Sequence, residues 1–275
     1  MKKKLFYCLT ASFFVFASCS NDIEIKKPTE IPQVLPKTIT FQSKVNNEIQ
    51  TNTFVYSGNK IVSVSRLAYD KIMKTVFTYN GNLITKTEGF VNNEIVSTTH
   101  YLYSKDKLKE AVLTLPNGSS TNEFYVKKVY SHNADGTISY ETFRHDAPDT
   151  AEDGKQILTF KNGNLAKIST EYSSQAPYTN DCEFNYDSKN NPLKNIVGLN
   201  LILFDGNLYN GHDMANGDFG INDFGLNNII KKITHVRDNS GTTNYSENYI
   251  YTYDKNGYPL TKKSDESEYD IIYTY

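Results

Sequence analysis

One stretch in the last third of the chain is rich in side chains that could bind calcium. Its candidate oxygen donors are Asp205, Asn207, Asp213, Asn216 and Asp218. Ca²⁺ takes roughly six to eight oxygen ligands, which carboxylates and amides supply. The spacing differs from that of an EF-hand, whose loop alternates its ligands and ends on a glutamate. We therefore predict a surface loop without a metal or any other cofactor, and a calcium site is the alternative.

The other residue types that carry catalysis form no motif. The histidines are scattered and include no His-x-x-x-His pair for zinc; they are His100, His132, His145, His212 and His235. The chain also has no Gly-x-Ser-x-Gly elbow, phosphate-binding loop or dinucleotide fingerprint. Adjacent acids such as Asp265 and Glu266 are typical of a solvated turn. We predict no enzymatic activity, and a hydrolase with a site assembled from residues distant in sequence is the alternative.

The N-terminus has the composition of an export signal. Three lysines follow Met1, a mostly apolar stretch runs from Leu5 to Phe16, and Ala17-Ser18 precede Cys19. This segment resembles the lipobox of bacterial lipoproteins, which implies cleavage of residues 1–18 and diacylation of Cys19. The alternatives are an uncleaved anchor or an ordinary signal peptide. The apolar stretch is shorter than the roughly 20 residues that a membrane-spanning helix needs.

The other cysteines form no pair. Cys8 leaves with the signal and Cys19 carries the lipid, so Cys182 is the single thiol of the mature chain. An intramolecular disulfide is therefore excluded. No nucleophile signature surrounds Cys182, and we predict a buried structural role for it.

Residues 19–37 are expected to form a tether between the lipid and the folded domain. Pro28, Pro32 and Pro36 recur every four residues, and proline favours an extended spacer. The acids Asp22 and Glu24 resemble the signal that exports lipoproteins of the Bacteroidota to the cell exterior. We expect an outer-membrane lipoprotein exposed at the cell surface, with the periplasmic face as the alternative.

The charge balance excludes two classes of partner. Removal of residues 1–18 takes away three lysines and no acid, so the formal net charge of −2 becomes −5. Nucleic-acid binding needs clustered Lys and Arg, and the mature sequence shows no such cluster. The balance also argues against a polybasic grip on anionic lipid, which leaves membrane attachment to the acyl chains.

Residues 38–275 carry the period-two pattern of half-buried strands. Ile39, Phe41 and Val45 alternate with polar residues, and similar runs continue to the C-terminus. An aromatic-x-aromatic pair before an Asn, Gly or Asp turn recurs about every 25 residues. The clearest pairs are Phe54/Tyr56, Phe77/Tyr79, Tyr101/Tyr103, Phe184/Tyr186 and Tyr251/Tyr253. This spacing predicts an all-β fold of repeated antiparallel β-hairpins in one large, twisted, curled meander sheet, with the aromatic pairs on one face.

An irregular insert at about residues 195–228 interrupts the repeat. Its first part, 195–204, is the most apolar run of the mature chain, and we predict a plug or short helix covering one end of the sheet. Its second part, 205–228, is rich in Gly, Asn and Asp. Loops of this length are often functional or disordered.

The repeats resemble two groups of known proteins. Tyr186-Asp187 and Tyr253-Asp254 are similar to the YD repeats of Rhs-type wall proteins. Together with the lipobox and tether, they resemble the Bacteroidota lipoproteins grouped as DUF4595-like. The resemblance implies a β-rich envelope protein and no particular activity.

The most promising binding residues are tyrosines near the C-terminus. Tyr245, Tyr249, Tyr251 and Tyr253 alternate on one predicted face, where they could stack on sugars or contact a protein. The alternative is that they pack within the sheet. We expect a binding or scaffold module for a glycan or protein ligand; a hydrolase or a purely structural surface protein are the other hypotheses.

Overall fold

The alternating side chains produce a single sheet. The computed structural model describes residues 33–68, 70–116, 124–172, 179–202, 225–238 and 241–275, and Gln33–Tyr275 form one unit. The strands are β1 (Thr38–Ser43), β2 (Ile49–Ser57), β3 (Lys60–Ala68), β4 (Lys71–Asn80), β5 (Leu83–Val91), β6 (Glu94–Ser104), β7 (Lys107–Leu115), β8 (Phe124–His132), β9 (Ile138–Arg144), β10 (Lys155–Lys161), β11 (Asn164–Glu171), β12 (Thr179–Tyr186), β13 (Ile229–Asp238), β14 (Gly241–Asn248), β15 (Ile250–Tyr253), β16 (Pro259–Lys263) and β17 (Tyr269–Thr274). The predicted signal and most of the tether lie outside the described residues.

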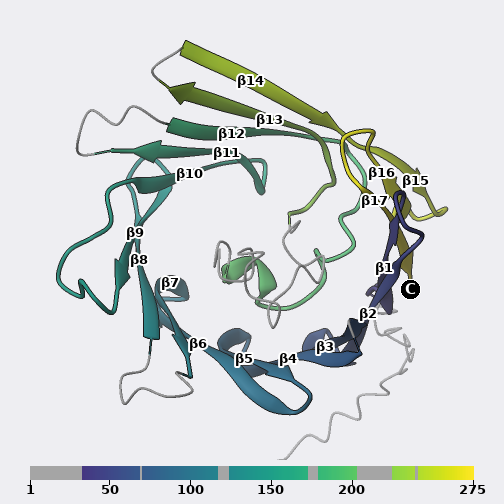
Figure 1. The fold of residues 1–275 in the computed structure, drawn as a ribbon, viewed down its shortest axis with the longest axis horizontal. Coiled ribbons are helices and arrows are strands. Elements are labelled where there is room, and N and C mark those ends of the chain that lie inside the picture. The colour runs from purple at the N-terminus through teal and green to yellow at the C-terminus, as the bar shows by residue number, and fades with distance from the viewer. Residues whose placement is uncertain (1–32, 69, 117–123, 173–178, 203–224, 239–240) are drawn as a thin grey trace, which may run out of the picture. The chain divides into compact units, whose positions relative to one another are not determined.

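The strands follow one another around the sheet in chain order. Each strand from β1 to β13 pairs antiparallel with the next, and β15, β16 and β17 continue the meander. β17 then pairs with β1, where Ile39 lies opposite Tyr273. The sheet has seventeen strands and curls until it is nearly closed (Figure 1). The predicted all-β meander of antiparallel hairpins is confirmed.

The closure is incomplete at β14. This strand and β15 belong to one extended segment, and only Tyr249 separates them. The first half of the segment pairs with β13 and the second half with β16. The sheet therefore changes partner along a single strand, and β14 extends past the neighbouring pair β15–β16 (Figure 1).

Each aromatic repeat contains the same local irregularity. The pairing register shifts immediately before the second aromatic residue, and a bulge of this kind re-aims the side chain that follows it. The shifts lie at Val55/Tyr56, Thr78/Tyr79, Leu102/Tyr103, Thr159/Phe160, Asn185/Tyr186 and Thr252/Tyr253. The repeat in the sequence is thus also a repeat of bulged hairpins.

The hairpin turns adopt two different geometries, of which only one is the type I′ turn that Asn-Gly steps favour. Lys105 and Asp106 both have positive φ, as type I′ requires. In the turn Gly81-Asn82 only Gly81, at φ 58°, is positive, which fits type II′. Both geometries match the twist of the flanking strands, so either one connects a tight hairpin.

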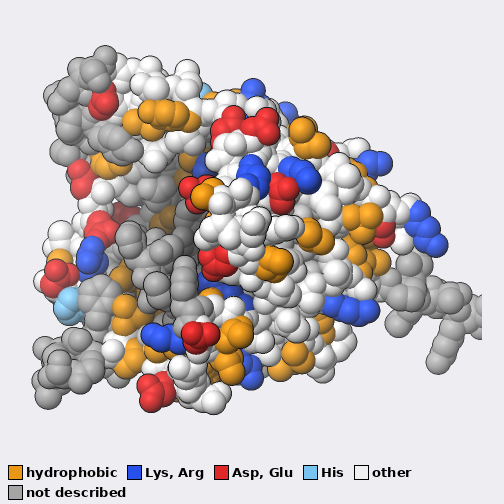
Figure 2. All heavy atoms as spheres, turned by 45° about the vertical axis from the view of Figure 1, so that its right-hand side comes forward, with side chains coloured by type: hydrophobic (Ala, Val, Ile, Leu, Met, Phe, Trp, Pro, Cys, Tyr) orange, Lys and Arg blue, Asp and Glu red, His pale blue; other side chains and the backbone are white. Residues whose placement is uncertain are grey.

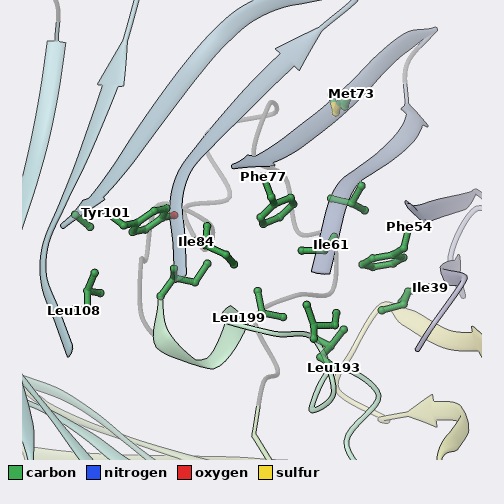
Figure 3. Packing of buried hydrophobic residues seen from close by; sticks show 14 of the residues in the cluster. Ile39, Phe54, Ile61, Met73, Phe77, Ile84, Tyr101, Leu108, Leu193 and Leu199 are labelled. Carbon is green, nitrogen blue, oxygen red and sulfur yellow. The ribbon is translucent and has the colours of Figure 1, made fainter. Parts of the chain in front are cut away.

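The hydrophobic core lies inside the curl at the end that carries the aromatic turns. Phe54, Phe77 and Tyr101 belong to this core, and their partners Tyr56, Tyr79 and Tyr103 pack against it. The predicted common face of these three pairs is therefore confirmed. Figure 3 shows Phe54, Ile61, Phe77 and Ile84 converging on one cluster.

The apolar start of the insert fills this end, as predicted. Leu193, Ile196, Leu199 and Ile202 are buried in the core, and Leu199–Leu201 form a short 3₁₀ helix, η1. Leu193 and Leu199 point into the cluster from below the strands (Figure 3). We call residues 193–202 the plug.

Backbone contacts fix the plug to the hairpin turns. The amide of Val197 donates to the carbonyl of Asn59 at 2.9 Å. Gly198, at φ 77°, lies so close that an added Cβ would stand 2.5 Å from the Asn82 carbonyl oxygen. The chain therefore needs glycine at this position, where the plug crosses the β4–β5 turn.

Candidate functional site

Three of the four candidate tyrosines are used within the sheet. Tyr251 and Tyr253 stack with ring centroids 5.8 Å apart. The Tyr251 hydroxyl donates to the carbonyl of Ile229 at 2.8 Å. Lys262 lies 4.2 Å above the ring of Tyr249 and 6.0 Å above that of Tyr251, which sequesters these rings in a cation–π contact.

The bond of Tyr251 belongs to a repeated set. Tyrosines of other aromatic pairs likewise donate to a carbonyl on a neighbouring strand: Tyr103 to Ile84 at 2.8 Å and Tyr186 to Leu165 at 2.7 Å. Tyr79 donates to Val197 of the plug at 3.1 Å. These hydroxyls link neighbouring strands and the plug, so the aromatic repeat stabilises the fold and is not by itself a binding surface.

Tyr253 forms part of a polar network with Asp187 and Asn228. Its hydroxyl donates to Asp187 Oδ2. Asn228 Nδ2 donates to the same oxygen at 3.1 Å, and the Asn228 amide to Asp187 Oδ1 at 3.1 Å. Burial, then the adjacent Asp187 carboxylate, raise the pKa of Tyr253. The network joins β12, the end of the insert and β15.

The acids of the two Tyr-Asp motifs therefore shape the backbone. Asp187 Oδ1 accepts the amide of Lys189 at 2.9 Å, and Asp254 Oδ1 accepts the amides of Asn256 and Tyr258 at 2.9 and 2.8 Å. Such bonds close Asx turns. Both motifs have a structural role at the end of a strand.

Tyr245 is the exception among the four tyrosines. The register aligns it with Thr234, Cys182, Ile168 and Leu158 along the inner side of the sheet, where Leu158 is 1 % exposed. Tyr245 itself is 61 % exposed because it lies on β14, where the curl is open. It makes no hydrogen bond or ring contact with any described residue, so most of its surface is available to a ligand.

β14 also has a free backbone edge. The amide of Tyr249 donates to Ile230 at 2.9 Å, and bonds to one neighbour alternate along an antiparallel strand. The residues whose backbone groups point away from β13 are then Thr242, Asn244, Ser246 and Asn248. No strand in the described part of the chain pairs with this edge. β14 contains neither proline nor lysine, the residues that commonly protect an edge.

The remaining predicted sites divide into described and undescribed residues. Cys19 and the calcium candidates Asp205, Asn207, Asp213, Asn216 and Asp218 lie outside the described residues. Cys182 is half-buried, with its sulfur 3.7 Å from Thr234 Oγ1. Across the described ranges no His, Cys, Asp or Glu side chains group as a metal site would require.

One histidine approaches an acid on the outer side of the sheet. His235 Nδ1 lies 2.8 Å from Asn244 Oδ1, and its Nε2 lies 3.9 Å from Glu183 Oε1. Lys167 bridges Glu183 and Asp181 at 3.8 and 3.5 Å. These groups lie on a strand surface, and no described nucleophile contacts them, so they resemble a surface ion-pair network.

Sequence reasoning missed two buried polar residues inside the curl. Asn52 and Thr75 are both 0 % exposed, and neither side chain has a hydrogen-bond partner among the described residues. Their strand positions could have predicted this burial. Asn52 is two residues from Phe54, and Thr75 is two residues from Phe77, so each polar side chain lies on the same face as a core aromatic. Ordered water is the usual partner of such groups.

Within the described ranges no helix is long and apolar enough to cross a membrane. A scan against protein-family models finds no match to the chain, and a search of curated proteins finds none either.

Proposed function

We propose that the chain is a non-catalytic binding module of the bacterial envelope. A lipid on Cys19 holds it in the outer membrane, with the domain displayed at the cell surface, and β14 recognises an extended segment of a partner protein. The single observation that carries the binding proposal is the unpaired outer edge of β14 beside the exposed ring of Tyr245.

Strand addition is the mode of recognition that fits this edge. An unpaired strand offers alternate amides and carbonyls to an incoming extended peptide. The side chains of β14 are short and polar apart from Tyr245 and Glu247, so the backbone is accessible. Tyr245, near the middle of the strand, would contact a side chain of the added peptide and supply selectivity.

A glycan is the second candidate ligand, and the exposed Tyr245 ring favours it. An aromatic face that is largely exposed can stack on a sugar. In this mode the backbone edge would have no role, which separates the two candidates by mutation.

The test uses two positions on β14. Ser246→Pro removes an amide that faces the free edge, whereas Ser246→Ala keeps it; proline is tolerated on an edge strand. A photo-crosslinking residue at Thr242 in cells reports a protein partner, and a glycan array reports sugars. Strand addition predicts a discrete crosslinked partner that is lost in Ser246→Pro and retained in Ser246→Ala.

The other outcomes are equally distinct. Array binding that Tyr245→Ala abolishes and Ser246→Pro leaves intact would replace the protein partner by a glycan. Crosslinks unaffected by Ser246→Pro, together with a blank array, would contradict a binding role for β14 and favour a purely structural protein.

A further inference from the structure

The meander brings every aromatic turn to the same end of the sheet. Antiparallel strands reverse direction at each step, so the turns β2–β3, β4–β5, β6–β7, β10–β11 and β15–β16 lie together. The plug contacts this end through Asn59 and Asn82. We call it the plug end and the other the far end.

Exposed lysines gather at the plug end. Six of them lie in these turns, between β12 and the plug, or at the start of the plug: Lys105, Lys107, Lys161, Lys189, Lys194 and Lys255. None forms an ion pair with a described residue. Lys194 Nζ donates to Asn190 Oδ1 at 2.6 Å and Lys189 lies 6.0 Å above the Tyr253 ring, contacts that leave both charges unneutralised.

Among the described residues of the plug end, acids are fewer than lysines and partly engaged. Asp106 and Asp135 are exposed, whereas Asp187 and Asp254 are half-buried and accept backbone amides. Two described turns of the far end are instead rich in acids. Its acidic turns are β9–β10, with Asp146, Asp149 and Glu152, and β16–β17, with Asp265, Glu266 and Glu268. In Figure 2 the charged side chains toward the right of the view are mostly lysine or arginine.

The chain also enters the domain at the plug end. Asn59 Nδ2 donates to the Gln33 side chain, and Asn195 Nδ2 donates to the Val34 carbonyl at 2.9 Å. Thirteen residues separate Cys19 from Gln33. At about 3.1 Å per residue they reach roughly 40 Å when extended, enough to let any face of the domain meet the membrane.

We propose that the plug end is a docking surface for a bilayer that carries anionic phospholipid. The inference rests on the lipid anchor of the proposed function, which keeps the domain within reach of the surface. Attraction falls off within a Debye length of about 8 Å, so the end where exposed lysines outnumber exposed acids among the described residues gains most from contact. The acidic far end is repelled, and together the two ends orient the domain with its plug toward the membrane. The net charge of −5 of the mature chain is a sum and does not show that lysines and acids gather at different ends.

The experiment uses the full chain carrying Cys19→Ser, so that docking is measured without acylation. Vesicles of phosphatidylcholine alone are compared with vesicles that also contain phosphatidylglycerol. We expect sedimentation with the anionic vesicles only, and its loss in high salt. Since one lysine near such a surface strengthens binding roughly fivefold, Lys161→Glu/Lys255→Glu should weaken it by at least about twentyfold.

The matched control reverses two exposed lysines away from the plug end, Lys71→Glu/Lys74→Glu, which change the net charge equally. Its binding should stay within about twofold of the parent, allowing for the long-range field. An equal loss in both variants, equal binding to neutral vesicles, or no binding to either kind would overturn the proposal. Palmitate labelling of the unmodified chain tests the anchor separately, so failure of docking and failure of anchoring are distinguishable.

Discussion

The hydroxyl of Tyr253 donates a hydrogen bond to the carboxylate of Asp187, 66 residues earlier in the chain. The bond connects the two Tyr-Asp motifs across the irregular insert. Asn228, the residue before β13, donates to the same carboxylate, so one acid holds three segments together.

Asp187→Ala should therefore destabilise the domain. It removes the acceptor of the backbone amide of Asn228, a residue that is 1 % exposed, and it removes an Asx turn. A buried polar group that loses its partner costs about 1–3 kcal/mol, and we expect a loss of about 2–3 kcal/mol in the free energy of unfolding. Urea denaturation measures it. Tyr253→Phe, which removes one bond of the network, should cost less; an Asp187→Ala protein as stable as the parent would contradict this role.

The buried tyrosines predict instability at alkaline pH. Burial raises the pKa of Tyr79 to about 12, and it raises the pKa values of Tyr56, Tyr103 and Tyr275 well above 10.0. Above pH 10 the unfolded chain has released protons that the folded chain retains, so stability falls as pH rises from 10 through 12. Urea midpoints near neutral pH and at about pH 11 should show this fall. Tyr79→Phe should make it shallower; an unchanged slope would assign the fall to other groups.

The plug should be required for stability. Leu199 is 1 % exposed in the core, and truncation of a buried leucine costs about 2–5 kcal/mol. Leu199→Ala should lower the free energy of unfolding by that amount. Leu102→Ala, at a leucine that is 53 % exposed on β6, is the control and should change it by less than about 0.5 kcal/mol. Equal effects of the two substitutions would show that the plug is dispensable.

Much of this architecture can be predicted from the sequence because it is determined by residues that are close together in the chain. Phe54 and Tyr56 share a face since strand side chains alternate, and Asn or Gly after each aromatic pair marks a turn. The apolar composition of residues 195–204 likewise predicts burial. Each of these inferences needs only neighbours in sequence.

The candidate site depends on contacts between distant residues. Tyr245, Tyr251 and Tyr253 look alike in the sequence, but only Tyr245 is on the part of the strand whose outer neighbour is missing. The partner change at Tyr249 and the bond from Tyr253 to Asp187 are set by tertiary pairing, which composition and periodicity do not reveal.

The predicted loop at residues 205–228 ends earlier than expected. Residues 205–228 were expected to form one surface loop, but Leu226, Asn227 and Asn228 bond to Asn164 and Asp187 and belong to the packed domain. A Gly-Ser linker in place of 205–224 should leave the melting temperature within a few degrees of the parent, because closure entropy changes slowly with loop length. Extending the replacement through 228 should destabilise the domain.

Addition of calcium distinguishes the two hypotheses for this loop, a surface loop without metal and a calcium site. Ligand that binds only the native state raises the melting temperature. We expect no calcium-dependent shift in the parent or in the 205–224 replacement. A shift that is lost on replacement would establish the alternative metal site, and unfolding of the replacement would show that the segment has a structural role.

The proposed location at the envelope depends on Cys19, and acylation of this residue is the most direct test of the proposed function. The full chain expressed in a lipoprotein-processing bacterium should incorporate labelled palmitate and remain with the membrane fraction after a high-salt wash. Cys19→Ala should incorporate no label and leave the membrane in the same wash, since the lysines of the plug end bind only in a salt-sensitive manner. A Cys19→Ala protein that resists high salt, or a parent chain without label, would contradict the lipid anchor.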